Sequence, residues 1–195
     1  MAKNMMSKLR EKFIAYATVE KVGKGRRAVA FLIDWYISTL LAGIPILYLF
    51  SVQSGSTEVP ESFTQFDGAL GIIAGLIGMA IITIYYVVIP LKYNKGQTLA
   101  KRFLGVKIVQ NDGSQVTAKN IIKREVLGAM LIEAGLVSSS KYLREMFLIL
   151  GMGYVYRTLA IVAMIIPFIS ILVMMFSKES KMIHDIIGGT KVVNA

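Results

Sequence analysis

The fold is decided by the stretch Arg27-Ala28-Val29-Ala30-Phe31-Leu32-Ile33-Asp34, which opens a long apolar segment. Arg27 and Asp34 are seven residues apart, close to two helical turns, so both lie on one helix face with the carboxylate about 10 Å deeper. A charge costs about 2.5 to 3.5 kcal/mol at the centre of a membrane helix. Asp34 therefore needs a partner, and this stretch is the first candidate site.

Hydrophobic residues make up 55% of the chain and occur in long blocks, which is typical of membrane proteins. Residues 28–50 contain one acid and no base, and residues 68–91 contain no charge. As core helices of a soluble protein, these blocks would expose too much apolar surface. We expect two membrane spans, and the spacing Gly71-Ile-Ile-Ala-Gly75 predicts a close helix contact, within one chain or between copies.

Charge gives the orientation. Eight Lys and Arg residues lie in residues 1–27 and eight more in residues 92–124, whereas residues 51–67 hold three acids and no base. By the positive-inside rule the amino terminus and residues 92–124 are cytoplasmic. Residues 1–25 have the pattern of an amphipathic helix on an anionic cytoplasmic leaflet, with a basic tail as the alternative. The net charge of +10 needs no nucleic acid partner, because aromatic-interleaved basic patches are absent.

A small cytoplasmic sheet is predicted after the second span. Residues 105–117 contain an Asp112-Gly113 turn between β-prone runs, a strong hairpin signal. A further β-prone run follows a short helix within residues 180–194, and a third strand would stabilise the hairpin. The sheet would join the middle of the chain to its end.

A cytoplasmic carboxyl terminus requires an even number of crossings. We therefore expect an α-helical polytopic membrane domain over residues 26–195, with a third segment near 120–138 and a fourth near 147–176. Three spans are the alternative, but Lys178 and Lys181 argue against an outside terminus. Four short spans make a thin bundle, so we expect a homo-oligomer.

Further charges need partners. Asp185 is predicted in the last turn of a helix over 180–188, where the dipole opposes a carboxylate. Its candidate cations are Arg26, Arg27, Lys101, Arg102 and Arg124. His184, the one histidine, is either an exposed polar residue or a proton-handling group. Glu133 and Arg157 both lie in apolar sequence and form a candidate pair.

Catalysis has little support. The chain has no cysteine, and it shows no nucleophile elbow, paired zinc histidines or phosphate loop. An intramembrane hydrolase that uses the serines at 138–140 with Lys141 or His184 is the remote alternative. We expect no enzyme, cofactor or metal.

Three separated motifs occur in order along the chain. They are Arg27 to Asp34, Gly96-Gln97-Thr98-Leu99-Ala100-Lys101-Arg102 with the run to Val109, and His184-Asp185 with Gly189-Thr190. Together they resemble the RDD family of bacterial and archaeal membrane proteins. The family is named for one arginine and two aspartates, which match Arg27, Asp34 and Asp185. The resemblance implies a multi-pass plasma-membrane protein and secondary transport, including exchange of a monovalent cation for a proton. Asp34 would then bind the ion, with Arg27 beside it.

The alternative function is a scaffold or regulatory subunit for a partner membrane enzyme, in which the charged residues lock the fold. A water-accessible Asp34 would favour transport, whereas an enclosed Asp34 would favour the lock. Because the cytoplasmic end of the chain brings Asp185 to the same face as Arg27, this arginine is expected to be shared or divided between the two aspartates.

Overall fold

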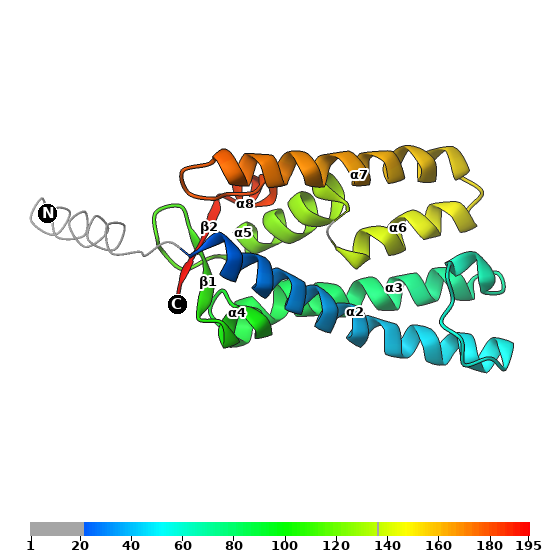
Figure 1. Ribbon diagram of the computed structural model, residues 1–195. Coiled ribbons are helices and arrows are strands. Elements are labelled where there is room, and N and C mark those ends of the chain that lie inside the picture. Colours follow the sequence, from blue (N-terminus) through cyan, green and yellow to red (C-terminus); the bar gives the residue numbers. More distant parts are fainter. Residues whose placement is uncertain (1–21, 136) are drawn as a thin grey trace, which may run out of the picture.

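The computed structural model describes residues 22–135 and 137–195 (Figure 1). The predicted amino-terminal helix falls almost entirely outside these residues. In chain order the elements are α2 (Lys24–Ser54), η1 (Phe63–Gln65), α3 (Leu70–Thr83), η2 (Ile84–Tyr93), α4 (Leu99–Phe103), β1 (Val106–Gln110), α5 (Ala118–Ile122), η3 (Lys123–Glu133), α6 (Ser138–Ile149), α7 (Gly153–Phe176), α8 (Ile183–Gly188) and β2 (Thr190–Asn194). Long helices run side by side, with α4, α8 and both strands gathered at one end, which we call the sheet end. The loops that join α2 to α3 and α6 to α7 lie at the other, far end (Figure 1).

Three helices of the described chain are long and apolar enough to cross a membrane: α2, the continuous helix of α3 and η2, and α7. They confirm the predicted apolar helices at 28–50 and 68–91 to within a few residues. In α2 the buried positions are Arg27, Ala30, Asp34, Ser38, Ala42 and Ile46, which recur every three or four residues and form one face. The exposed positions include Leu32, Leu40 and Ile44. The polar and small face therefore points inward and the apolar face outward, as a bilayer requires.

The third apolar segment is split, which corrects the prediction of one segment over 120–138. Helix α5 and the π-helical segment η3 run from the sheet end toward the middle, and α6 continues to the far end (Figure 1). The break includes Ala134, which has a φ of 48°. A Cβ at Gly135 would lie 2.0 Å from the carbonyl oxygen of Ala163, so the break packs directly against α7. The predicted fourth segment, 147–176, therefore combines the end of α6 with α7.

The sheet has two strands, not the predicted three. Strands β1 and β2 are antiparallel, with Val106 opposite Asn194 and Gln110 opposite Thr190. Gly113 has a φ of 86° in the predicted turn, but the returning arm makes only an isolated bridge between Val109 and Gln115. Thr117 and Asn120 then form a capping box that starts α5, so the chain turns into a helix before a third strand can extend.

The small-residue face of α3 packs within the chain. A Cβ at Gly75 would lie 3.0 Å from the side chain of Met146, and one at Gly78 would lie 2.6 Å from the ring of Tyr142. Both neighbours belong to α6. The predicted close contact is therefore confirmed, and it is made inside one chain.

Candidate functional site

Arg27 pairs with Asp185. The guanidinium donates through Nη2 to Asp185 Oδ2 and through Nη1 to the carbonyl oxygen of Ser180 at 2.7 Å. Arg124 Nε donates to the other carboxylate oxygen at 3.1 Å. Asp185 thus joins the start of α2 to η3 and α8, and it is fully buried. One carboxylate holds two arginines, so Arg27 is not shared with Asp34.

Asp185 lies in the first turn of α8, because this helix starts at Ile183 and not at residue 180 as predicted. Its Oδ2 accepts a hydrogen bond from the Met182 backbone N–H at 3.0 Å, so the helix dipole favours its charge instead of opposing it. Burial alone would raise the pKa of Asp185. The surrounding positive charges, Arg27 and Arg124 among them, outweigh burial and hold the pKa well below its usual range.

Asp34 is enclosed by other donors. Lys101 Nζ lies 2.9 Å from Asp34 Oδ2, and the hydroxyl of Thr98 donates to the same oxygen. Oδ1 accepts from the Tyr85 hydroxyl at 2.6 Å and from the Ala100 backbone N–H at 3.1 Å. The carboxylate has no exposed surface. A single intramembrane charge is thus satisfied by one cation and three neutral donors, which tie α2 to η2 and α4.

Glu133 and His184 form a third buried pair. His184 Nδ1 lies 2.7 Å from Glu133 Oε2, and Oε1 accepts from the His184 backbone N–H at 2.8 Å and from the Ser170 hydroxyl at 2.5 Å. On the other side of the ring, Arg124 Nη2 lies 2.9 Å from His184 Nε2. Because a guanidinium can only donate, Nε2 must accept and the ring proton is on Nδ1. His184 is therefore neutral in this arrangement.

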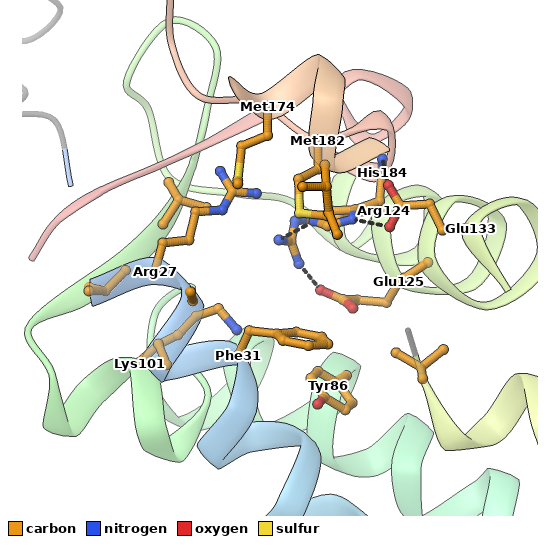
Figure 2. Close-up of a pocket in the computed structure, with 17 residues that line it drawn as sticks. Arg27, Phe31, Tyr86, Lys101, Arg124, Glu125, Glu133, Met174, Met182 and His184 are labelled. Atoms are coloured by element: carbon orange, nitrogen blue, oxygen red, sulfur yellow. Dashed lines mark hydrogen bonds and ion pairs between the residues drawn. The ribbon is translucent and has the colours of Figure 1, made fainter. Parts of the chain in front are cut away.

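A cavity of about 260 Å³ adjoins all three pairs (Figure 2). Its charged lining consists of Arg27, Lys101, Arg124, Glu125 and Glu133, with His184 beside them. In Figure 2 Arg124 lies between His184 and Glu125, and it donates a hydrogen bond to Glu125. Phe31 of α2 and Tyr86 of η2 face Arg124. The two aspartates are not among the lining residues. They lie behind the cations that line the cavity.

Residues 22–189 match the family model described as RDD family. The chain belongs to the RDD family. No significant match was found among curated proteins or solved structures.

In this RDD protein several charged residues have partners other than the predicted ones. Arg124, a candidate for Asp185, does bind it, but Lys101, named for the same role, binds Asp34. Arg157 is exposed on α7, and Glu133 pairs with His184 in its place. The prediction of an exposed His184 is wrong, because the side chain is buried between Glu133 and Arg124.

Some site residues were not predicted. Three of them are uncharged, so nothing in the sequence marks them as needing a partner: Tyr85, Thr98 and Ser170. The fourth is Glu125, which directly follows Arg124 in the sequence. Thr98 is the N-cap residue of the short helix α4, and Lys101 lies three residues later within it, so the two side chains lie on the same side of the chain. This spacing, within the motif Gly96 to Arg102, is the feature of the sequence that could have identified the partners of Asp34.

Proposed function

We propose that this RDD protein is a secondary transporter of the plasma membrane that exchanges a monovalent cation for a proton. The proposed exchange site is the cavity edge formed by Glu133, His184 and Arg124. The supporting observation is that buried ionisable side chains line a cavity at the break of a discontinuous helix, an arrangement that transporters use for ion sites. By the charge distribution, the sheet end is cytoplasmic.

The charge of the site favours a monovalent cation. The lining and its direct ion-pair partners contain four carboxylates, Asp34, Glu125, Glu133 and Asp185, against three fixed cations, Arg27, Lys101 and Arg124. With His184 neutral, this set of described residues carries one negative charge in excess. At low dielectric an uncompensated charge is costly. One added proton or one bound monovalent cation would neutralise it.

His184 couples the binding of the proton to the binding of the cation. Its ring is faced by Glu133 and Arg124 from η3, by Asp185 at 3.6 Å on its own helix, and by the neutral Ser170 of α7 through Glu133. Protonation at Nε2 removes the acceptor that Arg124 uses, so the guanidinium must move away. The protonated and cation-bound forms then exclude one another, which is the requirement for exchange at a single site.

The proposal moves the exchange away from Asp34. Asp34 does not line the cavity, and its two oxygens already accept from four donors, so it offers no coordination place for an incoming ion. We assign Asp34 and Asp185 a locking role, in which each joins separate segments of the chain.

The same enclosure favours the second function, a membrane scaffold whose charges serve only the fold. In that case the sheet end would dock a partner membrane protein, and no ion would cross. The two functions differ in whether the purified protein moves protons.

Flux in liposomes tests the proposal. We expect the parent protein to dissipate an imposed proton gradient when a monovalent cation, inorganic or organic, is supplied, and Glu133→Gln to abolish this response, because the amide keeps the shape of the site but removes its charge. Arg157→Gln, an exposed change on α7, is the matched control and retains the flux. A folded parent protein that moves no protons with any monovalent cation would favour the scaffold.

A further inference from the structure

The rim of the cavity is apolar. Six of its described lining residues are not fully buried, namely Ala28, Phe31, Val137, Ile171, Met174 and Met182. All of the charged lining residues are buried. A hydrated ion that entered here would have to shed water against apolar side chains before it reached any compensating charge. The rim therefore favours entry of an apolar molecule.

The rim opens between two helices whose outer faces are apolar. Ala28 and Phe31 belong to α2, and Ile171 and Met174 belong to α7. Next to the rim, α7 exposes Phe168, Leu172 and Met175, and α2 exposes Val29 and Leu32. Side chains of this kind face lipid in a membrane protein. A mouth between these two helices would open toward the bilayer, from which an apolar occupant would arrive.

The size of the cavity argues against a single inorganic ion. A water molecule occupies about 30 Å³ of the liquid, so about 260 Å³ far exceeds what one dehydrated ion fills. The volume approaches the lower end of the range for small organic ligands, about 300 Å³. The rings of Phe31 and Tyr86 offer π-faces to a cation, and Met174 and Met182 supply adaptable apolar walls.

We infer that the cation exchanged at this site is an apolar organic monocation, such as an aryl quaternary ammonium, which enters from the bilayer between α2 and α7. Its charge would lie near Glu133 and Glu125 and its apolar part against the rim. The inference rests on the proposed exchange function and names its substrate class. An anionic lipid fits less well, because the three cations at the cavity already bind carboxylates and negative charge is in excess.

Equilibrium binding to the purified full chain tests this inference with three probes of similar shape. They are benzyltrimethylammonium, its neutral isostere neopentylbenzene, and phenylmethanesulfonate. We expect saturable binding of the cation, with the other two at least about tenfold weaker. Preferred binding of the sulfonate, or equal binding of the neutral probe, would overturn the inference.

Two substitutions locate the site. Ile171→Trp fills the rim and should weaken cation binding by about tenfold or more, whereas Leu172→Trp, also exposed on α7 but outside the lining, should not. Equal binding by both variants would place the ligand elsewhere and contradict the inference. Na⁺ or K⁺ exchange without ammonium binding would refute only the substrate class. Ammonium binding without any proton movement would refute the proposed exchange while the binding site stands.

Discussion

At the scale of single residues, Asp185 is the carboxylate on which the charged network depends. It accepts from Arg27, from Arg124 and from the Met182 backbone N–H. Removing one partner of a buried ion pair leaves an uncompensated charge and costs about 3 to 5 kcal/mol. Asp185→Asn should therefore lower the free energy of unfolding by about that amount at neutral pH, measured by denaturation in detergent.

The loss of unfolding free energy in Asp185→Asn should depend on pH and become smaller in acid. The pKa of Asp185 is lowered in the folded protein, so its stabilisation is complete above the ordinary aspartate value of about 3.9 and is lost as the pH falls below it. The difference between the parent and Asp185→Asn should narrow below about pH 4. Asp67→Asn, an exposed change at the far end, is the control and should shift stability by less than about 0.5 kcal/mol. A difference that stays constant into acid would contradict the ion-pair assignment.

The sequence identified the right charged residues more successfully than their partners. Helical periodicity placed Arg27 and Asp34 on one face, and both are buried on that face. It could not decide the pairing, because Asp185 follows Arg27 by 158 residues and Asp34 is met by Lys101 67 residues away. Which cation reaches which carboxylate depends on how separate elements dock.

At the scale of elements, the glycines of α3 make a testable contact. A Cβ at Gly71 would lie 2.5 Å from the backbone oxygen of Phe63 and 2.7 Å from Ile149. Gly71→Ala must therefore displace backbone and should destabilise the protein by about 1 to 3 kcal/mol. Gly43→Ala in α2 meets nothing within 4 Å and should be neutral or stabilising, since alanine favours helix. Comparable thermal shifts for both variants would show that α3 does not pack as described.

Element boundaries were predictable where apolar blocks are uniform and not where they carry charge. Residues 28–50 and 68–91 correspond closely to α2 and to α3 with η2. The third segment carries Arg124, Glu125 and Glu133, so hydropathy alone could not outline it. Its π-helical half and the break at Ala134 depend on packing against α7, which no local pattern records.

At the scale of the whole molecule, the orientation in the membrane can be tested directly, because the chain has no cysteine. Thr57→Cys places a single thiol in the far-end loop, and Ser114→Cys places one in the turn at the sheet end. In intact cells a membrane-impermeant maleimide should label the first and spare the second, since basic residues are retained in the cytoplasm. Labelling of both after lysis is the control. Labelling of Ser114→Cys alone in intact cells would reverse the orientation.

The two-stranded sheet and the Arg27–Asp185 pair have a consequence for biosynthesis. Strand β2 and Asp185 are translated after every long helix, yet they complete contacts with β1 and with the first turn of α2. Helix α2 must therefore enter the membrane while the carboxylate that will neutralise Arg27 has not yet been synthesised. The Arg27–Asp185 contact can therefore form only after α2, α3 with η2, and α7 have all been synthesised.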